Sequence, residues 1–290
     1  MTQGITFFNF GGGCMVRLLV SLHSLRDHYK GPITLQLAKD DQFNIKALPD
    51  LEPLADIQWF DLERLARRNL KSVIKPMLFK LSPYDSTLML DGDLLVQRNP
   101  QPLLDGIDQK GFLVTRFSTW NCDGGRMRGR VIRCQEFLDK DYVENCLFSK
   151  LRKVAAINIG VMGWKKGHDK VLADWEKMTM NLAGQHIADE VACQVVYPRH
   201  QYFLADETWN SSCIYGAQPA PQAAILHFHG NKHTRLDRPS SRRWLKYLAL
   251  LRKSGKVSNM GEYLTWGDKA LSGRLKDTPR VLDDALRWED

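Results

Sequence analysis

The chain has 290 residues, of which 43% are apolar and 26% charged, and no segment is long and apolar enough to predict a membrane-spanning helix. The formal net charge of +8 predicts acidic partners, but no RRM-like, zinc-finger or helix-turn-helix signature accompanies it, so nucleic acid is not expected among them. The N-terminus carries no basic leader or cleavage site, which predicts a cytoplasmic protein. The length predicts one substantial core.

Short apolar runs, typical of buried strands, alternate with helical patterns from the N-terminus onward. The strand-like runs are 5–10, 32–38, 55–62, 87–96 and 112–117, and the helical patterns cover 14–29 and 63–81, the second interrupted by Pro76. This alternation predicts an α/β sheet with helices on both faces.

The segment 118–153 is polar and weakly periodic, which predicts a mobile loop over a site. A strand at 155–164, helices at 170–184 and 189–198 and a last strand at 223–230 follow. The remaining residues are helical and charged. The predicted organisation is therefore one α/β domain at 1–235 and a helical, basic appendage at 236–290.

The appendage combines an apolar stripe with a basic face. The stripe consists of Trp244, Leu245, Tyr247, Leu248 and Leu251, and the face of Arg242, Arg243, Lys246, Arg252 and Lys253. Such a helix suits peripheral contact with an anionic membrane through 242–253, at the inner membrane face, and it equally suits a surface helix docked on its own domain. Both interpretations stay open.

Two carboxylates interrupt the apolar run TLMLDGDLL. Asp91 and Asp93 flank Gly92, and in an extended segment both side chains reach the same side and can hold one hard divalent ion, Mg²⁺ or Mn²⁺. The alternative is a strand that simply ends in an Asp-Gly turn.

The run ILHFHGNKH supplies the residue types that complement two carboxylates. His227, His229 and His233 offer imidazole ligands, and Lys232 offers a cation for phosphate. The glycines after the first strand, Gly11 to Gly13, do not form GxGxxG, so they are either a structural turn or one that lets a nucleotide approach the backbone.

Five segments, in order, resemble the family 8 glycosyltransferases, the galactosyl/glucosyltransferase and glycogenin group. TLMLDGDLLVQRNPQPLLD is similar to their LDxD strand, AINIGVMGW to their FNSGVMLF segment, DEVACQ to a helix start, ETWN to a WN pair, and ILHFHGNKH to HFxGxxKPW. The resemblance spans about 5–233. It implies a GT-A fold, a mixed sheet flanked by helices.

The resemblance also implies a set of site residues. Asp91, Asp93 and His227 would hold Mn²⁺ (or Mg²⁺), and Asp189 would hold hydroxyls of the donor sugar. The remaining donor and nucleotide contacts would be Phe8, Asn9, Phe10, Gly11, Gly12, Lys75, Gly92, Asn158 and Lys232.

Three residues depart from the family pattern. Asn9 stands where many members have an aspartate, which leaves UDP as a first assignment of the nucleotide only. Lys232 comes one residue early, so His229 or His233 could share its work. Glu190 replaces a glutamine, and a carboxylate there could be the nucleophile of a covalent route, whereas front-side attack needs none. Both acids, Asp189 and Glu190, also suit the first turn of a helix.

The predicted function is a metal-dependent, retaining glycosyltransferase that moves a hexose, glucose or galactose, from a nucleotide diphosphate sugar to a glycan or lipid-linked acceptor. A catalytically silent sugar- or lipid-binding module is an alternative, but it would not need both aspartates and the histidine. A sugar nucleotidyltransferase is a further alternative, although the segment GGGCMVR lacks the lysine of the usual activation loop.

Overall fold

The computed structural model describes residues 1–10, 14–39, 41–61, 74–121, 125–140, 143, 154–185, 187–213, 222–229, 234–266 and 278–288. The chain divides into two compact units. Unit 1 comprises 1–5, 63–89 and 101–210. Unit 2 comprises 6–62, 90–100 and 211–290.

The main sheet has seven strands in the order β3-β2-β1-β4-β7-β6-β8. Their bounds are β1 Gln3–Asn9, β2 Ile33–Ala38, β3 Asp56–Phe60, β4 Ser86–Leu90, β6 Phe112–Asn121, β7 Ala155–Lys165 and β8 Phe203–Ala205. β2 and β3 are parallel, as are β6 and β8, whereas β6 and β7 are antiparallel. The sheet is therefore mixed, as predicted.

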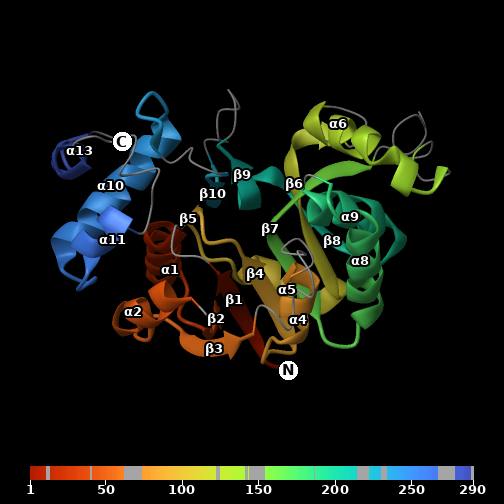
Figure 1. The fold of residues 1–290 in the computed structure, drawn as a ribbon, viewed down its shortest axis with the longest axis horizontal. Helices are drawn as coiled ribbons and strands as arrows, with labels where there is room; N and C mark the ends of the chain where they lie inside the picture. Colours follow the sequence, from red (N-terminus) through yellow and green to blue (C-terminus); the bar gives the residue numbers. More distant parts are fainter. Residues whose placement is uncertain are drawn as a thin grey trace. The chain divides into compact units, whose positions relative to one another are not determined.

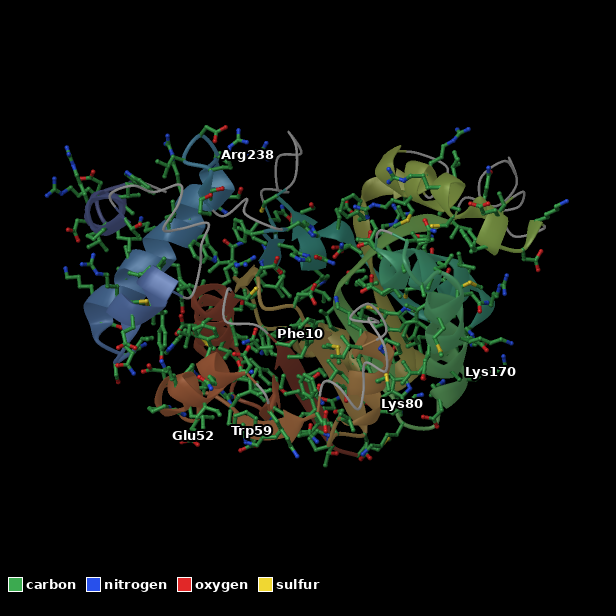
Figure 2. The ribbon with its side chains drawn as sticks, in the orientation of Figure 1. Phe10, Glu52, Trp59, Lys80, Lys170 and Arg238 are labelled. Carbon is green, nitrogen blue, oxygen red and sulfur yellow. The ribbon has the colours of Figure 1, made fainter. Side chains whose placement is uncertain are left out.

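Helices cover the strands of unit 1. They are α4 (Ile74–Lys80), α5 (Gln101–Lys110), α6 (Gly125–Arg133), α8 (Asp169–Asn181) and α9 (Ala188–Val196), with short 3₁₀ turns at 135–137, 197–199 and 207–210. Lys170, labelled in Figure 2, is on the exposed side of α8, and Trp175 is on its buried side. This division of one helix is what an amphipathic pattern specifies.

Two neighbouring residues of β7 show that helices lie on both of its faces. A Cβ at Gly163 would collide with Ile107 of α5, while the ring of Trp164 lies 6.4 Å from that of Phe79 in α4. Phe79 in turn lies 6.4 Å from Trp175 of α8. Because successive residues of a strand point to opposite faces, α5 covers one face and α4 with α8 the other.

Unit 2 contains the second sheet and the C-terminal helices. The sheet has the order β5-β10-β9, with β5 (Leu94–Val96) antiparallel to β10 (Ile225–His227) and β9 (Ser211–Ser212) parallel to it. The helices are α1 (Met15–His28), α2 (Gln42–Leu51), α10 (Pro239–Ser254), α11 (Met260–Trp266) and α13 (Thr278–Ala285). α10 and α11 pack on α1, and α13 packs on α10 (Figure 1).

The apolar stripe of the basic C-terminal segment is buried inside unit 2. Trp244, Leu245 and Leu248 of α10 are fully buried and Leu251 nearly so, while the Tyr247 hydroxyl donates to Asp27 at 2.6 Å. The stripe therefore serves the docking of α10 on its own unit. Contact of its basic side chains with a membrane stays a prediction, as does an independent appendage at 236–290.

None of the helices that the structure describes has both the length and the apolar character that a membrane crossing needs. The four described cysteines, Cys14, Cys134, Cys193 and Cys213, are free, and all but Cys14 are buried. Burial raises the pKa of the Cys193 and Cys213 thiols, that of Cys213 to about 12. Little thiolate therefore forms at these two positions at neutral pH.

The prediction of a single strand across 87–96 is wrong. β4 ends at Leu90 and belongs to the main sheet, whereas β5 begins at Leu94 and belongs to the small one. Asp91 and Asp93 lie in the turn between the two strands. The physical reason is that two charged carboxylates and a glycine suit an accessible turn better than a strand interior.

The predicted loop at 118–153 is also wrong where the structure describes it. β6 continues to Asn121, and α6 follows with Met127 and Val131 buried four residues apart on one side. Its many arginines made the segment polar, but arginine is a good helix former. Residues 122–124, 141–142 and 144–153 lie outside the described ranges.

Two helices differ from the sequence interpretation. α2 was not expected, because Pro49 interrupts its pattern; it begins where the Asp41 carboxylate accepts the amide of Phe43 at 2.9 Å. In the predicted helix at 63–81, the described part starts at Ile74 and carries Pro76 in its first turn. Proline is tolerated there, so it does not break this part.

Candidate functional site

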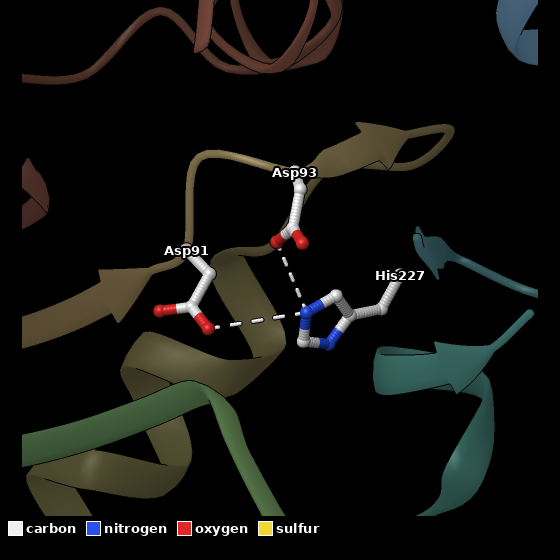
Figure 3. A group of neighbouring side chains, drawn as sticks. All are labelled: Asp91, Asp93 and His227. Carbon is white, nitrogen blue, oxygen red and sulfur yellow. Dashed lines mark ion pairs between the residues drawn. The ribbon is translucent and has the colours of Figure 1, made fainter. Parts of the chain in front are cut away.

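Asp91, Asp93 and His227 converge within unit 2. Nε2 of His227 lies 3.1 Å from a carboxylate oxygen of Asp93 and 3.9 Å from one of Asp91 (Figure 3). One ligand atom from each residue lies within 4.8 Å of the others. His227 is only 2% exposed, and the two carboxylates are partly exposed, so the cluster is open on the carboxylate side.

The pairing of β5 with β10 explains this convergence. His227 is opposite Leu94, the residue after Asp93, and the amide of Phe228 donates to the Asp93 carbonyl at 2.9 Å. Two residues more than 130 positions apart in the chain are thereby fixed by backbone hydrogen bonds. All six residues of the two strands are buried, so the pairing that fixes the cluster is itself held by the core of the unit.

Two serines of α1 hold the other edge of β5. The Ser21 hydroxyl accepts the Leu94 amide at 2.9 Å and lies 2.8 Å from the Leu94 carbonyl and 3.0 Å from the Gly92 carbonyl. The Ser24 hydroxyl accepts the Val96 amide at 3.1 Å. β5 is an edge strand, and these hydroxyls take the place of a neighbouring strand along that edge.

Asp93 has several electrostatic partners. Burial raises the pKa of this carboxyl, but its interactions with His227, which include a hydrogen bond, and with His229 and Arg17 lower it more, so its pKa lies well below the ordinary value. The rings of His227 and His229 lie 3.6 Å apart between centroids. Asp93 is therefore held in its ionised form, which is the form that binds a cation.

The donor set fits a hard divalent cation. Two carboxylates and one imidazole are typical ligands of Mn²⁺ and, with fewer nitrogens, of Mg²⁺, whereas zinc and copper sites are richer in thiolate or imidazole. The cluster supplies three ligands, which leaves further positions for water or phosphate oxygens. These residues fit the metal that the sequence predicts.

The end of β1 carries the predicted nucleotide contacts. The rings of Phe8 and Phe10 stack at 5.8 Å, and Phe10 is labelled in Figure 2. Asn9 is the residue between these two in the chain. Its side chain donates to Asn44 of α2 at 2.7 Å, and the residue is 5% exposed. Gly11 and Gly12 lie outside the described residues.

A separate buried network lies in unit 1. Asn158 of β7 donates to one carboxylate oxygen of Glu190 at 2.7 Å, and Arg130 of α6 contacts the other. The Asn158 side-chain oxygen accepts the Gly160 amide at 2.9 Å and the Asn210 side chain at 3.0 Å. The structure thus brings together Asn158 and Glu190, which are 32 residues apart in the chain.

The two acids of α9 have different partners. The Asp189 carboxylate accepts the amide of Glu190 at 2.9 Å, and the Asp189 carbonyl accepts the indole of Trp175 at 2.9 Å. Ile187, immediately before the helix, has φ of 55°. A β-branched residue in the left-handed region is strained, and such strain often accompanies functional sites.

The two predicted lysines fare differently. Lys75 is buried in α4 and donates to the carbonyl of Ile159 at 3.0 Å, so its amino group lies next to the strand residue after Asn158. Lys232, together with Gly230 and His233, lies outside the described residues.

Sequence reasoning missed several residues that hold these groups. Ser21 and Ser24 are three positions apart in an otherwise apolar helix, a spacing that could have indicated a shared partner. Arg130 lies in the segment that was expected to be a loop. Arg17 gave no signal, because its proximity to Asp93 depends on the fold.

The fold is similar to that of three solved structures. Mouse xyloside xylosyltransferase 1 is 14% identical, with a TM-score of 0.55 over 80% of this chain and 98% of that one. The galactosyltransferase LgtC, in complex with donor and acceptor sugar analogues, is 13% identical, with a TM-score of 0.57 over 87% of this chain and 99% of that one. The bifunctional glycosyltransferase WbbM is 14% identical, with a TM-score of 0.57 over 86% of this chain and 49% of that one.

No protein-family model matches the chain, and no curated protein matches its sequence. The similarity lies in the three-dimensional structure. The matched region, a mixed sheet flanked by helices, includes most of the chain. The protein therefore has the GT-A fold of these glycosyltransferases.

Proposed function

We propose that the protein is a metal-dependent, retaining glycosyltransferase. It moves a hexose from a nucleotide diphosphate sugar, with UDP as the first assignment, to a hydroxyl of a glycan or lipid-linked acceptor. The observation that carries this proposal is the convergence of Asp91, Asp93 and His227 in a chain with the GT-A fold. A binding module without catalysis would have no need for this ligand set.

In this proposal Asp91, Asp93 and His227 hold Mn²⁺ or Mg²⁺. When bound, the ion supplies positive charge that stabilises the departing diphosphate. The guanidinium of Arg17, which lies close enough to lower the pKa of Asp93, adds to the positive potential around the carboxylates. Ser21 and the pairing of β5 with β10 keep the carboxylates preorganised.

In this proposal the nucleotide binds at the end of β1. The stacked rings of Phe8 and Phe10 offer an apolar surface to the base, and the glycines at 11 and 12 permit close approach of the ribose. Lys232 is assigned to the diphosphate. Lys75 and Asn158 are assigned to the donor side, and their hydrogen bonds to β7 and Glu190 fix both side chains in place.

Asp189 is proposed to bind hydroxyls of the donor sugar, and Glu190 to act as a positioning residue. Both Glu190 oxygens are engaged, one by Asn158 and the other by Arg130. A nucleophile needs an oxygen lone pair directed at the anomeric carbon, and these contacts compete for it. This arrangement favours front-side attack, in which the leaving phosphate helps to deprotonate the acceptor.

A donor assay tests the proposal. The purified protein is incubated with a panel of nucleotide sugars and Mn²⁺, with and without glycan acceptors, and release of the nucleoside diphosphate is measured. We expect turnover with one donor and a loss of about a hundredfold or more in Asp93→Asn. The control, Asp56→Asn, removes an exposed carboxylate of β3 and should keep full activity. Turnover that Asp93→Asn leaves intact would refute the assignment of the metal ligands.

A further inference from the structure

A basic pocket lies in unit 2, apart from the carboxylates and His227. Its volume is about 380 Å³, within the range of small-molecule sites. The lining residues come from α1, from β5 and the residue after it, and from α10. They are His28, Leu95, Val96, Gln97, Arg243, Lys246, Tyr247 and Leu250.

One face of α10 forms a wall of this pocket. Arg243, Lys246, Tyr247 and Leu250 are spaced at i, i+3, i+4 and i+7, which places them on the same side of a helix. The opposite side of α10, with Trp244 and Leu248, is buried in the unit. The pocket therefore lies beside the buried side of α10, and Tyr247, which lines it, also bonds α10 to Asp27 of α1.

The pocket carries positive charge and no carboxylate of its own. His28, Arg243 and Lys246 line it, and none of its lining residues is Asp or Glu. The nearby Asp27 is already engaged, because it accepts the Tyr247 hydroxyl at 2.6 Å. Within the described ranges, Arg243 makes no hydrogen bond or ion pair, so its guanidinium keeps all its donors for a ligand.

Three aliphatic side chains and Gln97 also line the pocket. Leu95 and Val96 of β5 are buried, and Leu250 is 51% exposed. The Gln97 side chain is fixed by donating to the Ala223 carbonyl at 2.8 Å. A ligand with an anionic group at one end and an apolar body at the other matches this surface.

We propose that this pocket binds a phosphate monoester. The Arg243 guanidinium is suited to a phosphate, whose several acceptor oxygens it can meet in bidentate fashion, and the charge of a phosphate monoester matches a cluster of basic groups better than one carboxylate does. The monoester belongs either to a soluble organic phosphate or to a lipid headgroup. Both sources share this chemistry.

The pocket is distinct from the carboxylate cluster but connected to it by β5. Leu95 and Val96 follow Asp93 by two and three residues, which in a strand is about 7 and 10 Å. The separation means that a ligand can fill the pocket without using the metal ligands. Binding of a ligand in this pocket needs no transfer reaction, so a binding measurement tests it independently of the proposed function.

Calorimetric titration with phenyl phosphate, in the presence of a chelator, tests the proposal. The informative variant is Arg243→Gln. The matched control is Lys253→Gln, which removes the same charge from an exposed position of the same helix outside the pocket. A second control, Asp93→Asn, separates the pocket from the carboxylate cluster. Flotation with phosphatidylcholine vesicles, with and without phosphatidic acid, distinguishes a lipid headgroup from a soluble ligand.

We expect Arg243→Gln to weaken binding of phenyl phosphate by about tenfold or more, since a hydrogen bond between charged groups is lost. Lys253→Gln and Asp93→Asn should stay within about twofold of the wild type. Vesicle binding that requires both phosphatidic acid and Arg243 would show that the phosphate belongs to a lipid headgroup. Binding of phenyl phosphate without vesicle binding would show that it belongs to a soluble ligand. Equal losses in Arg243→Gln and Lys253→Gln, or no binding by the wild type to either probe, would overturn the proposal.

Discussion

At the scale of single residues, the hydroxyl of Ser21 helps to fix the geometry of the carboxylate turn. Ser21 is fully buried and contacts backbone groups on both sides of Asp93, at Gly92 and at Leu94. Ser24 makes the equivalent contact at Val96, three residues beyond Asp93. The two serines therefore differ in their distance from the carboxylates but not in the kind of bond they make.

Ser21→Ala should weaken Mn²⁺ binding by about tenfold, because the residues that orient metal ligands contribute on this scale. It should also lower the free energy of unfolding by about 1–3 kcal/mol, since the buried Leu94 amide loses its acceptor. Ser24→Ala should show the loss of stability with Mn²⁺ affinity nearly unchanged. Titration of Mn²⁺ followed by electron paramagnetic resonance and urea unfolding measure the two quantities. Equal losses of affinity in both variants would contradict a specific role for Ser21.

A second prediction at this scale concerns Glu190. If its carboxylate positions Asn158 and Arg130, Glu190→Gln keeps an acceptor for Asn158 and should lower kcat by about ten- to a hundredfold. A nucleophile would lose far more, about a thousandfold or beyond, in the same variant. Steady-state kinetics with the preferred donor decides between the two roles. Mass spectrometric detection of a glycosylated Glu190 would contradict the positioning role.

At the scale of helices and strands, the period of apolar residues predicted most elements correctly. β1, β2, β7, α1 and α8 are short or amphipathic runs whose burial follows from their own sequence. The failures lie where tertiary contacts decide. The turn at Asp91–Asp93 is fixed by α1 and β10. The apolar stripe of α10 was identified from the sequence, but that it packs within its own unit follows only from contacts with α1 and α13.

The glycine that ends α5 gives a prediction at this scale. Gly111 has φ of 78°, its amide donates to the Ile107 carbonyl at 2.7 Å, and a Cβ there would collide with His168. Gly111→Ala should therefore lower the free energy of unfolding by about 2 kcal/mol or more. Gly129→Ala, at an open position inside α6, should instead raise it by about 0.5–1 kcal/mol. Urea unfolding of both variants measures the difference, and a neutral Gly111→Ala would contradict the helix end described.

At the scale of the whole chain, the sequence indicated the architecture through the order of its motifs. The pieces around Asp91, Asn158, Asp189 and His227 are individually weak, and the solved structures with this fold are only 13–14% identical. Which segments make up each compact unit could not be predicted from the sequence. Unit 2 joins 6–62, 90–100 and 211–290, and a division of this kind follows from long-range pairing such as that of β5 with β10.

The proposed function depends most directly on Asp91, Asp93 and His227 holding a metal ion to which a nucleotide binds. The most direct measurement is thermal unfolding with a panel of nucleoside diphosphates and nucleotide sugars, each with and without Mn²⁺. The variants are Asp93→Ala and the control Asp56→Ala, which removes an exposed carboxylate of the same unit. A ligand at about a hundred times its Kd adds roughly 2.7 kcal/mol, enough to raise Tm by several degrees.

We predict that one nucleotide raises Tm only when Mn²⁺ is present, that Asp56→Ala keeps this shift, and that Asp93→Ala abolishes it. An equal shift in Asp93→Ala, or no shift with any pair of nucleotide and metal, would contradict the account.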